Sequence, residues 1–427
     1  MYCGSCLRDN ALASEMLSRG HDVMLTPLYT PTRTDERNVS GGHVFLGGIS
    51  VFLEQHSPIF RHTPRFLDRL WDSDWALRLA TKRQIKVDPK SLGELTVSML
   101  RGEDGFQRKE IAKLLEWLVT EPRFDVVNLP YTLLLGLAEP IKRALKAPVC
   151  CTLQGEDLFL DGLGEPYRRQ SLELIRAASA HVDAFLPVSR YYYDYMQPYL
   201  GVPGEKMRLA PLGINLDGYG RGGDVPRTKA RSGPFTIGYF ARIAPEKGLH
   251  ELCEAYRRLR ARPGMGEARL VAAGYLAAEH QPYLDTAMRR MREWGLEKEF
   301  EYRGEVDRSE KLAFLRSLDV LSVPTTYEEP KGIFLLEAMA SGVPVVQPRR
   351  GAFPEIIENT GGGLIVDADN PEALADGLMR IWRDPALGAA LGAAGAAGVR
   401  EHYNVGRMAE EVEKIYRDVI AKRGAAV

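Results

Sequence analysis

The feature that most constrains the fold of this chain is a regular alternation of short apolar runs with longer helical patterns. The alternation occurs in two series. The first contains HDVMLTPLY, FDVVNLP, APVCCTL, DAFLPVS and KMRLAPLG, and the second contains FTIGYF, ARLVAAG, EFEYRG, DVLSVPT, VPVVQP and GGLIVD. Near-continuous apolar strands that alternate with helices are typical of parallel sheets covered on both faces. The sequence therefore predicts two doubly wound α/β domains, with ligand crevices at the carboxyl ends of their strands.

Residues 218–233, GYGRGGDVPRTKARSG, separate the two series and contain almost nothing that a core would bury. This composition is typical of a linker. We therefore predict an N-terminal domain over 1–217, a C-terminal domain over 234–404 and a closing helical segment over 405–427.

One segment, residues 55–121, interrupts the alternation because it is mainly helical and rich in aromatic and basic residues. One interpretation is a lid over the acceptor or a surface that contacts a membrane. The other is an ordinary helical insertion, in which Trp71 and Trp75 lie one turn apart and pack into a small core. We favour the insertion.

The charge and cysteine content exclude several classes of function. The chain has 56 basic and 57 acidic residues, which gives no electrostatic reason to expect a nucleic acid as a partner. No apolar run approaches the ~18 residues of a membrane span. Five cysteines, mostly in apolar surroundings, indicate a reducing compartment. We expect a cytoplasmic protein, with peripheral contact at the inner membrane face as an alternative.

The sequence contains no convincing metal site. Cys3 and Cys6 form a CxxC pair, but zinc needs two further ligands at a matching spacing, and Cys150, Cys151 and Cys253 supply no second pair. We expect neither a metal nor a redox role for these cysteines.

Two carboxylates in the stretch EEPKGIFLLEAMASGVPVV, Glu329 and Glu337, are separated by seven residues. A strand precedes this stretch, and a helix is expected from Ile333 to Gly342. Gly332 then lies at the helix entry, where unpaired N–H groups and the helix dipole favour an anion. The two acids would reach different parts of one polar ligand, and a carboxylate suits two vicinal sugar hydroxyls. The alternative is two surface glutamates.

Two cations, Arg242 and Lys247, lie in the loop between the strand FTIGYF and a helix that we expect to begin near Pro245. Cations at the carboxyl end of a parallel strand, beside a helix entry, suit a diphosphate. The alternative is a solvated basic loop. No P-loop and no GxGxxG pattern follows any strand.

The succession GYFARIAPEKGL, YRGEV, DVLSVPTTYEEPKGIFLLEAMASGVPVV and GGGLIVDADNPEAL resembles the donor half of glycosyltransferase family 4. These are retaining, nucleotide-sugar-dependent enzymes of GT-B fold, with two Rossmann-like domains that face a central cleft. By this resemblance the closing helix crosses back to the first domain. The chain departs from the family at Lys331, where an apolar residue is usual, and this departure puts the local loop packing and the choice of sugar in question.

The resemblance also implies a role for each donor-site residue. It places the donor diphosphate on Arg242 and Lys247, the ribose hydroxyls on Glu337, and the donor sugar near the reacting centre on Glu329. The remaining contacts come from backbone groups, which cap the sugar and phosphate at Gly332, Ile333 and Phe334 and meet the nucleobase at Gly304, Glu305 and Val306.

The N-terminal half resembles the family more loosely, through MYCGSCLRDNALASEMLSRGHDV. Gly4 and Ser5 would lie close to the transferred sugar. Gln154 stands where many members carry a histidine near the reacting sugar. An amide cannot act as a base, so Gln154 would position the sugar by hydrogen bonding, and Glu156 or Asp157 would meet the acceptor. The alternative for this segment is an ordinary turn after a strand.

We therefore expect a retaining glycosyltransferase that moves a sugar from a nucleoside-diphosphate sugar to a glycan, lipid or small-molecule acceptor. We expect no cofactor and no metal, because Arg242, Lys247 and the helix entry already balance the diphosphate charge. Two alternatives remain open. One is a relative that hydrolyses or epimerises a nucleotide sugar, and the other is a catalytically silent protein that binds one.

The chain opens directly on the loop and helix that normally follow the first strand of a doubly wound domain. In the order that the family implies, this strand lies in the middle of the sheet, and its absence would leave its two neighbours with unpaired backbone groups. We hypothesise that Met1 is not the true start and that an apolar strand lies upstream. The alternative is a genuine deletion that other strands close.

Overall fold

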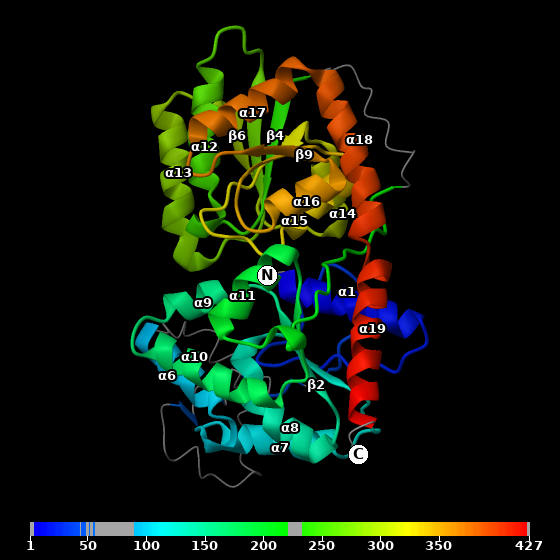
Figure 1. The fold of residues 1–427 in the computed structure, drawn as a ribbon. Helices are drawn as coiled ribbons and strands as arrows, with labels where there is room; N and C mark the ends of the chain where they lie inside the picture. Colours follow the sequence, from blue (N-terminus) through cyan, green and yellow to red (C-terminus); the bar gives the residue numbers. More distant parts are fainter. Residues whose placement is uncertain are drawn as a thin grey trace. The chain divides into compact units, whose positions relative to one another are not determined.

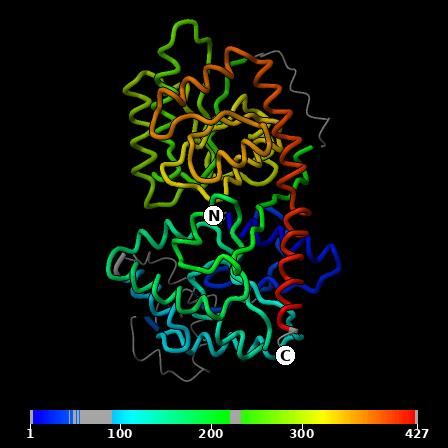
Figure 2. Tube along the Cα trace, viewed as in Figure 1, coloured from blue at the N-terminus to red at the C-terminus, as the bar shows by residue number. Residues whose placement is uncertain are grey.

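A computed structural model of the chain describes residues 4–42, 44–47, 51, 54–55, 89–220 and 233–424. The chain divides into two compact units (Figures 1 and 2). Unit 1 consists of Met1–Ala11 and Leu212–Met408, and unit 2 consists of Leu12–Pro211 and Ala409–Val427. The change of unit at 211–212 lies close to the domain boundary predicted at 217. The first residues of the chain, however, belong with the C-terminal sheet rather than with the N-terminal one.

Unit 1 is built on a six-stranded sheet whose strands are all parallel. Its order is β6 (Phe300–Tyr302), β5 (Ala268–Ala273), β4 (Phe235–Phe240), β7 (Val320–Leu321), β8 (Val345–Pro348) and β9 (Gly363–Val366). All six strands predicted for this half are confirmed. The chain fills one side of β4 first and then the other, so the order reverses between β4 and β7. This reversal is the point at which doubly wound sheets bind their ligands.

Helices cover the sheet of unit 1 in two groups (Figure 1). In the first group α12 (Leu249–Arg260) packs against α13 (Gln281–Glu293) and α17 (Pro371–Arg383). In the second, α15 (Ile333–Ala340) and α16 (Phe353–Thr360) pack against α18 (Pro385–His402), and α14 (Arg308–Arg316) packs against α15. A parallel sheet needs cover on both faces because its strands are apolar on both sides.

Unit 2 contains a parallel sheet in the order β1 (Val127–Leu129), β2 (Val149–Leu153) and β3 (Ala184–Pro187). Three of the five predicted strands are thus confirmed. The prediction was wrong for HDVMLTPLY and KMRLAPLG, which form only the single bridges Leu28↔Phe45 and Phe185↔Met207. A ladder needs an extended neighbour along its whole length. KMRLAPLG runs beside β3, where Arg208 and Ala210 donate N–H groups to the carbonyls of Phe185 and Pro187, and HDVMLTPLY bonds in the same way to Phe45. Among the described residues neither contact continues into a ladder.

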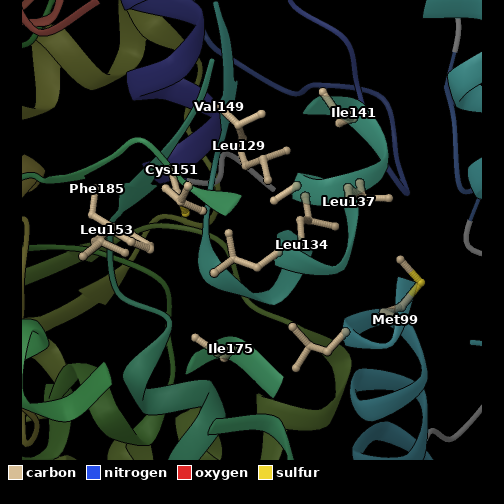
Figure 3. Packing of buried hydrophobic residues seen from close by; sticks show 14 of the residues in the cluster. Met99, Leu129, Leu134, Leu137, Ile141, Val149, Cys151, Leu153, Ile175 and Phe185 are labelled. Atoms are coloured by element: carbon tan, nitrogen blue, oxygen red, sulfur yellow. The ribbon is translucent and has the colours of Figure 1, made fainter. Parts of the chain in front are cut away.

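Helices surround this smaller sheet. They are α6 (Pro89–Leu100), α7 (Arg108–Leu118), α8 (Ala138–Leu145), α9 (Asp157–Gly162), α10 (Tyr167–Ala178) and α11 (Arg190–Leu200), with the 3-10 turns η2 (Gly102–Asp104), η3 (Thr132–Leu137), η4 (Ser179–His181) and η5 (Gly204–Lys206). As Figure 3 shows, their apolar side chains meet those of β2: Cys151 and Leu153 lie in one cluster with Leu134 and Ile175. Every residue of β2 is buried, which explains its continuous apolar run.

The predicted helical insertion is described at Gln55 and from residue 89 onward, and Trp71 and Trp75 lie outside the described residues. The described part contributes to the main core of unit 2, since Ile111 is fully buried in the same cluster as β2. The ring of Trp117 lies 4.5 Å from that of Phe45.

Two long helices have residues in both units: α1 (Gly4–Ser18) and α19 (Val405–Gly424). Within unit 2 the two are linked, because Arg19 Nη2 lies 3.4 Å from a carboxylate oxygen of Glu410 and His21 Nε2 lies 3.0 Å from one of Glu413.

The loops that follow β4 and β7 approach each other so closely that one position requires glycine. Gly248 has φ +73°, and a Cβ placed on it would lie 1.8 Å from the carbonyl oxygen of Pro324. Gly264 has a similar φ of +79°, but no atom lies within 4 Å of its Cβ position.

We predict that Gly248→Ala destabilises the protein much more than Gly264→Ala. Both variants carry the cost of a left-handed alanine, about 1–2 kcal/mol. Gly248→Ala adds a backbone collision, which raises the cost by about 1–3 kcal/mol or more. Urea denaturation measures both values, and equal losses of unfolding free energy would contradict the close approach.

Candidate functional site

The residues predicted to bind a donor come together at the point where the strand order of unit 1 reverses. Lys247 ends a 3-10 turn, η6 (Pro245–Lys247), in the loop after β4, and Glu329 lies in the loop between β7 and α15. The predicted α-helix near Pro245 was placed too early: α12 begins at Leu249, after the left-handed residue Gly248. The left-handed turn interrupts the helix and turns Lys247 toward the neighbouring loop.

Glu329 and Lys247 form a buried ion pair. Lys247 Nζ lies 2.5 Å from Glu329 Oε2, and the Glu329 side chain is 3% exposed. The hydroxyl of Tyr327 also donates to Oε2. The other oxygen, Oε1, accepts the backbone N–H groups of Lys331 at 3.2 Å and Gly332 at 3.4 Å. A carboxylate offers about four acceptor positions, so Glu329 contacts another ligand only by exchanging one of these partners.

These contacts determine the protonation of Glu329. Burial by itself raises the pKa of this carboxyl, but the charge and hydrogen bond of Lys247, the Tyr327 hydroxyl and the charge of Lys331 together lower it to about 2. Glu329 is therefore ionised at neutral pH. The Tyr327 hydroxyl stays protonated, because burial and the adjacent carboxylate raise its pKa well above the ordinary value.

The entry of α15 has the form that the sequence predicted. The helix begins at Ile333, directly after Gly332, whose φ is +62°. The positive φ is what favours glycine at this position, since a Cβ at Gly332 would meet only the end of a flexible side chain, Ile356 Cδ1, at 2.9 Å. The N–H groups of Ile333 and Phe334 belong to the first turn, where a helix supplies no backbone acceptor. They are available in principle to an anion at this end of the helix.

Glu337 lies inside α15 and is held by two residues that the sequence did not single out. Lys311 Nζ, from α14, lies 2.6 Å from Glu337 Oε1, and the Tyr219 hydroxyl donates to the same oxygen at 3.1 Å. Both ends of the ion pair are buried, at 4% and 6% exposed. The sequence offered one signal for a buried cation here: Lys311 lies on the same face of α14 as the buried Phe314 and Leu315.

The other predicted donor contacts lie around the same sheet edge. Arg242 is partly exposed and pairs with Glu246 at 3.0 Å. Gly304 and Glu305 follow the edge strand β6, where the Gly304 carbonyl accepts the N–H of Gly274 at 2.8 Å. Nothing lies within 4 Å of a Cβ at Gly304, so this loop leaves room for a flat group.

Gly4 and Ser5 begin α1 and belong with unit 1. Lys331 Nζ donates to Ser5 Oγ at 3.0 Å. A Cβ at Gly4 would lie 3.3 Å from Ile333 Cδ1. The structure thus brings the N-terminal glycine next to the α15 entry. Lys331, the residue that departs from the family pattern, links the two.

Gln154 follows β2 in unit 2, and its side-chain amide donates to the carbonyl of Pro130 at 2.8 Å. Its donor group therefore joins the ends of β1 and β2. Glu156 accepts N–H groups from Gln154, Gly155 and Thr132, and Asp157 accepts the Tyr192 hydroxyl at 2.7 Å. Burial raises the pKa of both carboxyls. These contacts give Glu156 and Asp157 a structural role in shaping the turn.

In the part of the chain that the structure describes, no group of three or more His, Cys, Asp or Glu side chains is arranged to hold a metal ion. No helix among the described residues is both long and apolar enough to cross a membrane.

Comparison with known proteins identifies the family. The profile named Glycosyl transferases group 1 matches residues 224–397, and that named Glycosyltransferase Family 4 matches residues 96–217. The chain belongs to glycosyltransferase family 4. This family has the GT-B fold. The chain superposes with a TM-score of 0.69 on sucrose-phosphate synthase from Thermosynechococcus elongatus, at 18% identity over 96% of this chain and 92% of that one.

Two curated family 4 relatives are informative. The chain is 35% identical to a phosphatidyl-myo-inositol mannosyltransferase of Mycobacterium leprae over 34% of its own length and 38% of the relative's. It is 27% identical, over 67% of its length and 74% of the relative's, to a protein of Mycolicibacterium smegmatis. That protein is a GDP-mannose-dependent alpha-(1-6)-phosphatidylinositol monomannoside mannosyltransferase. The chain spans about half or less of the length of several relatives that it matches.

The lowered pKa of Glu329 predicts a specific pH dependence. A carboxyl whose pKa falls on folding stabilises the protein above its ordinary pKa of 4.5, and this stabilisation is lost as the pH falls toward about 2. The difference in unfolding free energy between wild type and Glu329→Gln should therefore be constant above about pH 5. Below that pH it should shrink by roughly 1.4 kcal/mol per pH unit.

Urea denaturation from about pH 6 to about pH 3 measures this difference. The contributions of all other carboxylates to the unfolding free energy cancel, because both proteins contain them. Lys247→Met serves as the matched variant, because it removes the other half of the pair. A difference that stays constant throughout the range would contradict the ion pair.

Proposed function

We propose that this protein is a retaining glycosyltransferase that moves a sugar from a nucleoside-diphosphate sugar to a hydroxyl of an acceptor. The observation that carries the proposal is the buried Lys247–Glu329 pair beside the entry of α15, at the reversal point of the sheet. A cation, the N–H groups of a helix entry and a carboxylate meet there. Membership of family 4 supports the same reaction.

The proposed reaction exchanges one bond at the anomeric carbon. The bond from this carbon to the diphosphate oxygen breaks, and a bond to the acceptor oxygen forms on the same face of the sugar. The acceptor proton passes to the leaving diphosphate. Lys247 and Arg242 stabilise the charge that develops on the diphosphate, together with the N–H groups of Ile333 and Phe334.

Glu329 has two tasks in this proposal. In the free protein it holds Lys247 in place. When the diphosphate takes over the ammonium group, an acceptor position on Glu329 is released for a hydroxyl of the donor sugar. Glu337, buried against Lys311, receives the ribose hydroxyls, and Gly304 and Glu305 face the nucleobase. Gln154 is proposed to position the sugar by hydrogen bonding.

The acceptor is proposed to be a glycan, a lipid or a small polyhydroxy molecule. The names of the two relatives support a lipid-linked polyol and a mannose donor, and such an acceptor would bring the protein to a membrane surface. We also propose that the reaction needs no metal ion, because protein cations at the site take the place of one.

The test is incubation of the full chain with a panel of nucleoside-diphosphate sugars and candidate acceptors, in the presence of EDTA. We expect release of one nucleoside diphosphate and a product with the anomeric configuration of the donor, determined by NMR. Arg242→Ala should weaken binding of that nucleoside diphosphate by about 1.5–3 kcal/mol. An inverted product, or activity that only a divalent ion restores, would overturn the corresponding part of the proposal.

The two glutamates should differ in their kinetic roles. Glu329→Gln should lower kcat far more than it weakens nucleoside diphosphate binding, because its proposed partner is the sugar. Glu337→Gln should chiefly raise the donor Kd. Isothermal titration and steady-state kinetics separate the two effects, and the same profile for both variants would refute this division.

A further inference from the structure

A buried arginine near the start of α1 lacks partners for one edge of its guanidinium group. The side chain of Arg8 is 0% exposed, and its Nη1 lies 2.8 Å from a carboxylate oxygen of Asp9. Its Nε and Nη2 are also buried, and neither has a hydrogen-bond partner among the described residues. A guanidinium group stays charged in proteins, and each buried donor left unpaired costs about 1–3 kcal/mol.

The face of α1 that carries Arg8 approaches the α15 entry at Gly4. Arg8 is in unit 1, one turn after Gly4 on the same face of α1. Helical side chains lean toward the N-terminus of their helix, and on this ground we infer that Arg8 leans over the turn that contains Gly4 and Ser5. Lys331 Nζ lies at that turn too, 3.0 Å from Ser5 Oγ and 3.8 Å from the Cβ position of Gly4.

The chemistry of the two side chains indicates their ligand. Nε and Nη2 form the side edge of the guanidinium plane, and their parallel N–H groups match two oxygens of one phosphate or carboxylate. Lys331 adds a second positive charge, and the fifteen-residue helix α1 adds the N–H groups of its first turn. Neither side chain belongs to the set proposed for the donor diphosphate.

We propose that Arg8 and Lys331 bind an oxyanion that a substrate carries in addition to the donor diphosphate. This inference rests on the proposed function, since it assigns a chemical class to the substrates of the same site. The anion comes from one of two sources: a phosphate on the acceptor, or an acid group on the donor sugar.

The first test uses the full chain saturated with GDP or UDP, whichever binds, so that the diphosphate positions are filled. Inorganic phosphate is then compared with chloride at equal ionic strength in a thermal-shift titration. We expect phosphate to raise the Tm of wild type. We expect Arg8→Met and Lys331→Met each to weaken the apparent phosphate affinity at least tenfold. Arg19→Met, which removes a partly exposed arginine just after α1, is the matched control and should behave as wild type.

Stability in the absence of ligand separates a binding role from a structural one. If Arg8 serves to bind a ligand, its unpaired N–H groups destabilise the ligand-free protein. Arg8→Met should then unfold at the same or a higher urea concentration than wild type. A structural arginine would make the variant less stable. Arg8→Lys, which keeps the charge without the planar fork, should recover only part of the phosphate affinity.

The second test identifies the source of the anion. If the anion is a phosphate on the acceptor, inorganic phosphate should raise the Tm. The neutral and uronic acid forms of the nucleotide sugar should then bind with equal affinity. An acidic donor predicts tighter binding of the uronic acid form, and this preference should disappear in Arg8→Met.

The proposal is wrong if wild type responds to neither probe or if both variants keep the wild-type response. It is also wrong if Arg8→Met loses affinity for the nucleoside diphosphate itself, which would place Arg8 at the donor diphosphate. Unchanged nucleoside diphosphate binding in all variants shows that the proposed function stands independently of this result.

Discussion

The ion pair between Lys247 and Glu329 is the interaction on which the arrangement of the site depends. It joins the loop after β4 to the loop after β7, and it does so in a buried position, where charges are costly unless paired. The backbone supports the same contact. The Glu329 carbonyl accepts the N–H of Ala352 at 2.8 Å, and Gly351 packs so tightly that a Cβ would lie 2.2 Å from that carbonyl oxygen. Loss of either charge leaves the other buried without its ion-pair partner.

The pair also bears on the proposed donor binding, because a protein carboxylate already holds the Lys247 ammonium group. The positive charge of Lys247, beside the α15 entry, is paired with the carboxylate of Glu329 rather than solvated by water. The diphosphate binding that we propose would exchange one oxyanion for another around Lys247, whose desolvation has already occurred in folding.

Much of unit 1 was predictable from sequence because local signals determine it. Gly332 and Ile333 mark a helix entry, and six apolar runs mark six strands. The partners of the two glutamates were not predictable. Lys311 lies 26 residues from Glu337 and Tyr219 lies 118 residues away, and no periodicity indicates which cation or hydroxyl folding brings to a given acid. Tyr327 was missed although it stands only two residues from Glu329.

In the run KMRLAPLG of unit 2 the apolar pattern indicated burial correctly and strand formation incorrectly. Met207 and Ala210, in the run KMRLAPLG, are 2% and 0% exposed, yet only Met207 forms a bridge to a strand. An apolar run shows that a segment is covered, whereas a ladder also needs a free neighbouring edge. In HDVMLTPLY burial was predicted wrongly as well, since Met24 is 40% exposed, and its one bridge, at Leu28, joins it to Phe45 rather than to a strand of the sheet.

The buried cysteines give each unit its own reporter of native-state opening. Cys150 and Cys151 lie in β2 of unit 2, and Cys253 lies in α12 of unit 1. Burial raises the pKa of Cys150 and Cys253 to about 12, so neither thiol reacts as a thiolate while its surroundings stay closed. The rate at which an alkylating reagent reaches them therefore measures how often β2 or α12 separates from its core, and it does so without any introduced label.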